Sequence, residues 1–205
     1  MPVVAPILSN AIQAQFLLKK LTGRDAINIA GSVGSAVARY LTLPNIVTCT
    51  LNGTAGPVGN LNSIAVVGLV PNIMSNLMIG KAASKRFSGR DINNFCNAIS
   101  LGLSQVLVGM VLSGTAIGIA LGGGTGSFTV LDERVLSSLL YGEMLRRNIN
   151  GTRTTSLCEI ISFGIVNHLK TSVKFTIVVT GAVAPTPPIG PIPVAGIPSV
   201  YTQVS

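Results

Sequence analysis

A short basic motif recurs three times along the chain and relates its three parts to one another. It reads KRFSGRD at residues 85–91, KKLTGRD at 19–25 and, more loosely, RRNINGTR at 146–153. In each copy a basic pair ends an apolar periodic run, a small polar residue and Gly form a turn, and a second periodic run follows. The motif therefore predicts three helical hairpins built to one plan.

The similarity extends beyond the motif when the three copies are aligned without gaps on Gly23, Gly89 and Gly151, and we call this the repeat alignment. The second and third copies then share eight identities over 74–102, including Cys96 with Cys158. The first and second copies share seven, with Ala30 where the other copies have Cys. Repeats of this size predict structural units whose apolar faces are buried against their neighbours.

Hydrophobic periodicity predicts two helices in each copy, followed by residues of strand type. The helices are expected at 6–21, 25–41, 72–87, 91–107, 132–148 and 152–169. Alternating β-branched residues predict strands at 46–51 and 63–70 around a turn at 52–59, a glycine-punctuated hairpin over 106–131, and a strand at 172–184.

These patterns predict an α+β fold of three pseudo-repeats packed as one cooperative domain. Residues 1–70, 71–131 and 132–184 are the three units, each a helical hairpin followed by a β-strand or Gly-rich hairpin. Residues 185–205 are Pro-rich and uncharged, so we expect an extended C-terminal tail that lies on another surface as an interface. The tail prolines are Pro185, Pro187, Pro188, Pro191, Pro193 and Pro198.

Charge is scarce and unevenly placed. Only 10% of the residues are charged while 48% are apolar, which is an unusually hydrophobic composition for a soluble monomer. No charged residue occurs at 41–80, 92–131 or 175–205. We therefore expect much of the surface to be covered by other copies of the chain, by other proteins or by lipid.

The net charge of +8 could attract nucleic acid, an acidic protein or an anionic membrane surface. Cations are also favoured at helix C-termini for structural reasons alone. Pseudo-threefold packing would gather the basic turns at one end of the molecule, as a contact for an acidic partner subunit. The residues concerned are Lys19, Lys20, Arg24, Lys85, Arg86, Arg90, Arg146, Arg147 and Arg153.

The titratable residues do not form a catalytic or metal-binding pattern, so we predict no enzyme, no cofactor and no metal. His168, the single histidine, lies near the end of a predicted helix, where a cation is favoured. Asp25 and Asp91 are expected as helix N-caps, and Asp132 as a helix start. No Cys/His cluster has metal spacing, and the three cysteines are interpreted as small buried hydrophobes in a reducing compartment.

The glycine run at 122–126 lacks the Lys of a phosphate-binding loop, and it lies between expected strands rather than between a strand and a helix. It is interpreted as a turn or a close backbone contact. The start of the chain lacks the basic region and the continuous apolar run of a signal peptide, so no secretion is expected.

Two alternative functions follow from the same residues. A small membrane-associated protein of lysis or pore type would use the uncharged run at 92–131, although its most apolar part, 106–121, is shorter than the roughly 20 residues of a spanning helix. A nucleic-acid packaging or scaffold protein would use the basic turns. However, the expected helices at 26–41 and 92–107 carry almost no Arg, Lys or Gln to read bases.

The three ααβ-type copies, the Gly/Thr-rich turns at 53–56 and 114–116 and the ending GPIPVAGIP at 190–198 resemble uncharacterised virion structural proteins of tailed bacteriophages, especially contractile-tailed phages of cyanobacteria. The resemblance implies a non-enzymatic tail, baseplate, neck or capsid accessory subunit, present in many copies. Its partners would be other virion proteins and copies of itself, and its place the virion, after assembly in the host cytoplasm. The resemblance brings no catalytic residues.

Overall fold

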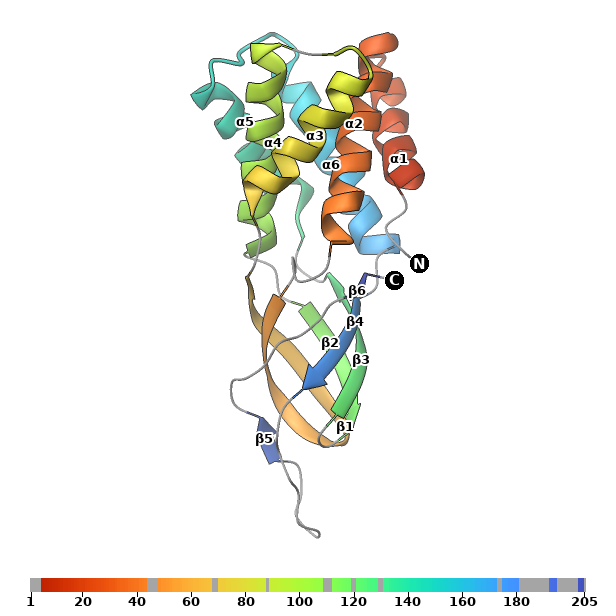
Figure 1. Cartoon of the computed structure of the whole chain (residues 1–205), viewed down its shortest axis with the longest axis vertical. Helices are drawn as coiled ribbons and strands as arrows, with labels where there is room; N and C mark the ends of the chain where they lie inside the picture. The colour runs from red at the N-terminus through yellow and green to blue at the C-terminus, as the bar shows by residue number, and fades with distance from the viewer. Residues whose placement is uncertain are drawn as a thin grey trace.

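The computed structural model describes the backbone of residues 5–43, 48–67, 70–87, 89–108, 112–118, 121–128, 131–172, 175–180, 192–194 and 203–204. Side chains are described within the helical part alone, over 5–43, 70–87, 89–108 and 131–171. Figure 1 shows a bundle of helices at one end of the molecule and a sheet at the other.

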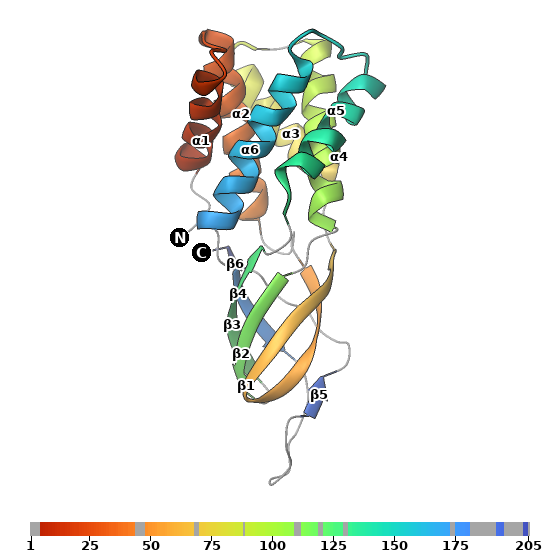
Figure 2. The same ribbon diagram turned by 180° about the vertical axis from the view of Figure 1, so that it is seen from behind.

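Six helices form the bundle, as three successive hairpins. These are α1 (Ala5–Leu18) with α2 (Arg24–Leu41), α3 (Pro71–Ser84) with α4 (Arg90–Val108), and α5 (Glu133–Arg146) with α6 (Thr154–Ser172). Each helix packs on its neighbours in sequence, and α1 also packs on α6 (Figures 1 and 2). The helices therefore form a closed ring, in which the contact between the first and last helix completes a series of contacts between consecutive helices.

The core repeats in the same repeat alignment that relates the basic motifs. Each of the three shorter helices, α1, α3 and α5, buries three apolar side chains at equivalent positions. The equivalent sets are Leu8, Met74 and Leu136; Ile12, Met78 and Leu140; Phe16, Ala82 and Met144. The ring is therefore pseudo-threefold symmetric, and its core lies among the helices.

Six strands follow the helical hairpins and pair into one antiparallel sheet. They are β1 (Thr48–Val67), β2 (Leu112–Gly118), β3 (Leu121–Phe128), β4 (Phe175–Thr180), β5 (Ile192–Val194) and β6 (Gln203–Val204), in the order β5-β1-β2-β3-β4-β6. Segments that leave all three hairpins thus meet at one end of the molecule (Figure 2).

The predicted α+β class is wrong, because the packed body is all-helical. Six helices and no strand make up the part of the chain whose side chains are described, and the core within that part is built by helices alone. The physical reason is that the closed ring gives the apolar stripe of every helix a helical neighbour, so no strand is needed to cover it. The proposed unit boundaries at 70, 131 and 184 stay predictions.

The strand predictions also differ from the structure in detail. The turn expected at 52–59 lies inside β1, which runs from Thr48 to Val67 with an irregular register between Gly56 and Gly59. The hairpin expected from residue 106 begins later, because α4 continues to Val108. Of the C-terminal tail, Pro193 lies in β5 opposite Thr54, whereas the other tail prolines lie outside the described residues.

Candidate functional site

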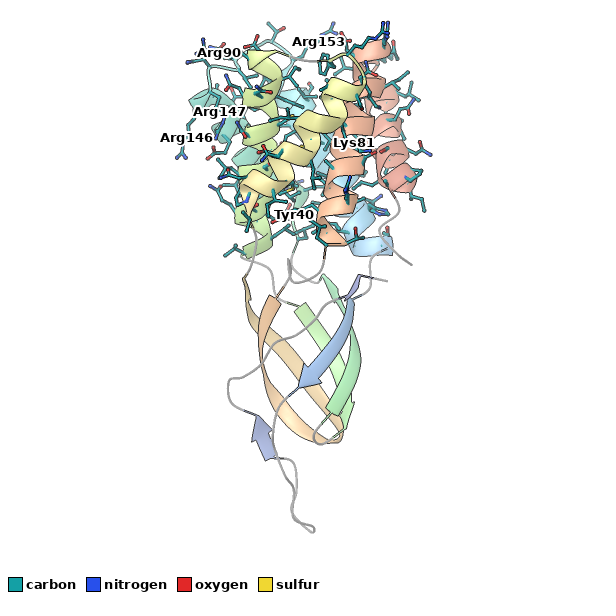
Figure 3. The ribbon with its side chains drawn as sticks, viewed as in Figure 1. Tyr40, Lys81, Arg90, Arg146, Arg147 and Arg153 are labelled. Atoms are coloured by element: carbon teal, nitrogen blue, oxygen red, sulfur yellow. The ribbon has the colours of Figure 1, made fainter. Side chains whose placement is uncertain are left out.

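The turns that join the two helices of each hairpin all lie at the end of the bundle far from the sheet. This end carries the nine basic residues predicted to gather, and we call it the basic end. Figure 3 shows Arg90 and Arg153 at this end, with Arg147 and Arg146 lower on the side of the bundle. The structure thus brings the predicted site residues together, and their role in partner binding stays a prediction.

One turn geometry places all three basic pairs. Lys20, Arg86 and Asn148 adopt left-handed backbone conformations, with φ of 55°, 59° and 58°. In the first copy the N–H of Leu21 donates to the carbonyl of Phe16 at 2.9 Å, and the same bond recurs from Phe87 and from Ile149. These are Schellman helix ends, which satisfy the last helical carbonyls and turn the chain sharply.

Glycine begins the second helix in two of the three copies. Gly23 and Gly89 have φ of 130° and 138°, a conformation that side chains strongly disfavour. The prediction that Asp25 caps the second helix is wrong, because Gly23 is the N-cap and Asp25 lies inside the first turn without a side-chain cap bond. Asp91 likewise lies in the first turn of α4. Asp132, in contrast, accepts a hydrogen bond from the N–H of Arg134 at 2.7 Å and caps α5.

Three of the nine cations are paired within the chain. Glu143 is buried and accepts from Arg146 at 2.9 Å and from Arg147 at 2.6 Å, which neutralises a carboxylate that burial alone would destabilise. Lys19 pairs with Glu159 at 2.9 Å, with both side chains about half exposed, so this pair contributes at most about 1 kcal/mol.

The remaining six cations have no ion-pair partner among the residues that the structure describes. They are Lys20, Arg24, Lys85, Arg86, Arg90 and Arg153. All three turns contribute to this set, so the cations surround the basic end rather than cover one side of it. Unpaired cations at such density attract anionic groups and speed the approach of an anionic partner.

An apolar hollow lies at the centre of the basic end, and we call it the axial hollow. It has a volume of about 290 Å³, and its lining is Ile29, Phe87, Asp91, Ile92, Phe95, Asn148, Ile149 and Leu157. Three of these residues, Ile29, Phe95 and Leu157, are equivalent in the repeat alignment. One equivalent residue from each hairpin therefore lies in the lining of a single hollow, although the second and third hairpins contribute most of that lining.

A larger groove of about 520 Å³ runs along the side of the bundle between α1, α5 and α6. The Lys19–Glu159 pair lies in its lining, together with Glu133 and Arg134. Two cations and two carboxylates give this groove no net charge. It is therefore a weaker candidate than the axial hollow for binding a charged partner.

Burial shifts the pKa of several titratable groups in the helical core. Burial raises the pKa of both Cys96 and Cys158 to about 12, which keeps the thiols protonated and unreactive. His168 is only 3% exposed, and burial lowers its pKa. Burial therefore disfavours the cationic form of His168, which the end of a helix would otherwise favour. Within the described residues, no group of three or more His, Cys, Asp or Glu could hold a metal ion.

A buried tyrosine and the axial hollow are among the features that sequence reasoning missed. Tyr40 is fully buried in α2, and its hydroxyl accepts a 2.6 Å hydrogen bond from the backbone N–H of Val70, just before α3. Burial raises the pKa of this tyrosine. The axial hollow was also missed, although the equivalence of Ile29, Phe95 and Leu157 in the repeat alignment was a signal that could have located it.

Comparison with known protein families, curated proteins and solved structures finds no match to this chain. No helix among the described residues is both long and apolar enough to cross a membrane. The fold and the site together define a closed ring of three helical hairpins with a basic end around an apolar hollow.

Proposed function

We propose that this protein is a non-enzymatic structural subunit that acts through contacts with an acidic partner and with copies of itself. The observation that carries the proposal is that the two ends of the molecule differ in charge. Six cations at one end have no ion-pair partner among the described residues, and the strands at the other end contain no charged residue. A molecule with two chemically different ends is suited to join two kinds of neighbour in one assembly.

The basic end supplies the contact with a different protein. Three cations pair with Glu143 and Glu159, and the other six, which have no ion-pair partner in the described part of the chain, are the ones we expect to meet carboxylates of a partner. Charge complementarity of this kind gives orientation and specificity to a protein contact. It also keeps copies of the chain apart at this end, because like charges repel.

The sheet and the C-terminal tail supply the contacts between copies. Among the described strands, β5 pairs with β1 only at Gly53, Thr54 and Ala55, although β1 spans 20 residues. An uncharged strand that is longer than its edge partner favours the addition of a strand from another chain. The resemblance to phage virion proteins supports a particle such as a virion as the setting, with assembly in the host cytoplasm.

Light scattering on the purified protein in detergent-free buffer tests this proposal. We expect a discrete oligomer for the whole chain and dissociation when the residues after Ala184 are removed. Recovery of the protein only with lipid or detergent would overturn the proposal in favour of a membrane-associated protein.

Neutralising the basic turns tests the other contact. Replacing Arg24, Arg90 and Arg153 by Gln should impair co-assembly with an acidic partner subunit and leave DNA affinity unchanged. DNA binding that falls steeply with salt and weakens in this variant would instead identify a nucleic-acid packaging protein.

A further inference from the structure

The axial hollow has the size and the lining of a pocket for a single side chain. Its volume of about 290 Å³ is at the lower limit of small-molecule pockets, which hold whole ligands at roughly 300–1,000 Å³. Its walls include Phe87, Phe95 and Leu157, so a polar group placed against them would lose its hydration without gaining a hydrogen-bond partner from these three side chains. An aromatic or aliphatic side chain would instead gain from burial.

The surroundings of the hollow are strongly positive. Phe87 and Ile149 line the hollow from two of the basic turns. Each directly follows the residue of its turn that has a left-handed backbone conformation, Arg86 or Asn148. Helices α2, α4 and α6 all begin at this end, so the partial positive charges of their N-termini add to those of the six unpaired cations. A ligand seated in the hollow is therefore surrounded by charges that favour an anionic molecule.

We propose that the axial hollow receives one apolar side chain of an acidic polypeptide segment from a partner protein, while carboxylates of that segment pair with the surrounding cations. This inference rests on the proposed function and specifies the chemistry of the partner. An apolar anchor in a central pocket with charged contacts around it is the arrangement that concentrates binding energy in protein interfaces.

A carboxylate in the lining favours a polypeptide over a nucleic acid. Asp91 lines the hollow, and Asn148 lies in the same lining. A carboxylate can accept hydrogen bonds from the backbone N–H groups of a peptide, whose backbone is uncharged, whereas every nucleotide of a nucleic acid carries a phosphate that the carboxylate repels. Asp25 holds the equivalent position in α2 but is not part of the lining, so the chain contains its own control for this contact.

The first test uses an acidic synthetic peptide with one central Phe and a second peptide with Ser in its place. We expect the Phe peptide to bind the whole protein roughly tenfold more tightly, as measured by isothermal titration calorimetry. The protein is unchanged in this comparison, so the result does not depend on a variant that folds. Equal affinity of the two peptides would overturn the proposal.

The second test fills the hollow. Ile29→Phe adds volume to the lining, and the fold already accepts Phe at the equivalent position 95. We expect this variant to lose the preference for the Phe peptide. The matched control is Ile27→Phe, at a half-exposed position of the same helix, which should keep that preference. Retention of the preference by Ile29→Phe would place the apolar contact elsewhere.

The third test compares Asp91→Asn with Asp25→Asn, which change the net charge equally. Weaker binding of the Phe peptide by Asp91→Asn alone supports a peptide contact at the hollow. Tighter binding of a single-stranded oligonucleotide by both variants, together with weak binding of both peptides, would identify nucleic acid as the ligand and overturn the proposal.

The outcomes separate this inference from the proposed function. If both acidic peptides bind equally and lose affinity when Arg24, Arg90 and Arg153 become Gln, the basic end binds acidic partners but the hollow holds no anchor. If neither peptide binds the unmodified protein, and the charge variant co-assembles normally, the acidic-partner contact itself is wrong.

Discussion

At the scale of single residues, the three helix ends place unusual side chains in a left-handed conformation. Lys20 and Arg86 adopt φ of 55° and 59°, a region that usually holds glycine, and Asn148 occupies the third equivalent position. Asn tolerates this conformation through local hydrogen bonds, whereas Lys and Arg incur a steric cost of about 1–2 kcal/mol relative to Gly. Lys20 and Arg86, two cations of the basic end, therefore occupy positions at which glycine would give a more stable fold.

We predict that Lys20→Gly and Arg86→Gly each stabilise the fold by up to about 1 kcal/mol, because relief of the steric cost exceeds the entropy that Gly loses on folding. Urea denaturation measures the change. Lys20→Gln, which removes the charge and keeps a side chain, should give no such gain, and Asn148→Gly a smaller one. Destabilisation by both Gly variants would show that the basic side chains support the turns.

His168 is the residue whose protonation should affect stability. Burial lowers its pKa in the folded state below the ordinary value of 6.5, and its Nε2 atom has no hydrogen-bond partner among the described residues. The unfolded chain then binds the proton more readily than the folded chain. The stability associated with the neutral imidazole is present above about pH 6.5 and is lost as the pH falls below it.

We predict that the free energy of unfolding of the unmodified protein declines between about pH 7 and pH 5, and that this decline is shallower in His168→Leu. Because the chain has one histidine, the difference between the two pH profiles isolates this residue. At neutral pH the variant should be no less stable, since it removes a buried unpaired nitrogen. Parallel profiles would show that His168 is solvated in the folded state.

At the scale of elements, glycines set how closely neighbouring helices approach. A Cβ atom on Gly102 of α4 would lie 2.7 Å from Leu140 of α5, and one on Gly164 of α6 would lie 2.7 Å from Ile12 of α1. Gly102 and Gly164 are equivalent in the repeat alignment, as are the two helix pairs that they join. The contact that closes the ring therefore has the same geometry as a contact between consecutive helices.

We predict that Gly102→Ala and Gly164→Ala each destabilise the protein by about 1–2 kcal/mol, because the added methyl group overpacks a contact with backbone atoms nearby. Gly80→Ala and Gly142→Ala are the controls, since a Cβ at either position meets nothing within 4 Å. These controls should gain up to about 1 kcal/mol from helix propensity. Thermal melting with matched urea titrations measures the change in stability of the two test variants and the two controls. An increase in stability in all four variants would mean that the helices can move apart at no cost.

At the scale of the whole molecule, the ring is closed by a non-covalent contact between its first and last helices. Ile12 in α1 and Leu140 in α5 occupy equivalent buried positions, and each packs beside a glycine of the preceding helix in the ring. The chain connects α4 to α5, but only packing connects α6 to α1. Full cooperativity of the ring requires that this packing be as strong as in the connected pairs.

We predict that Ile12→Ala and Leu140→Ala cost similar amounts, about 2–5 kcal/mol each, as buried large-to-small substitutions do. Denaturant unfolding monitored by circular dichroism should show a single transition for both variants. A cost near zero for Ile12→Ala, with a full cost for Leu140→Ala, would show that α1 detaches from an otherwise stable ring.

Much of the helical part was predictable because its signals are local. Every helix end lies within three residues of its expected position: α2 ends at Leu41 as predicted, whereas α1 ends at Leu18 rather than at residue 21. Apolar spacing, the basic pairs and the glycines at 23 and 89 act over one or two turns of chain, so the sequence states them directly. The pairing of Arg146 and Arg147 with Glu143 is also local, at i,i+3 and i,i+4 spacing, and could have been recognised.

The helices, their turns and the threefold repetition were determined by the sequence alone, because neighbouring residues create them. Tertiary structure decided that the helices close into a ring and that Ile29, Phe95 and Leu157 converge on one hollow. These features depend on contacts between residues that belong to different hairpins and lie far apart in the chain. The same local patterns are compatible with several such arrangements, and only the packing of all six helices selects one.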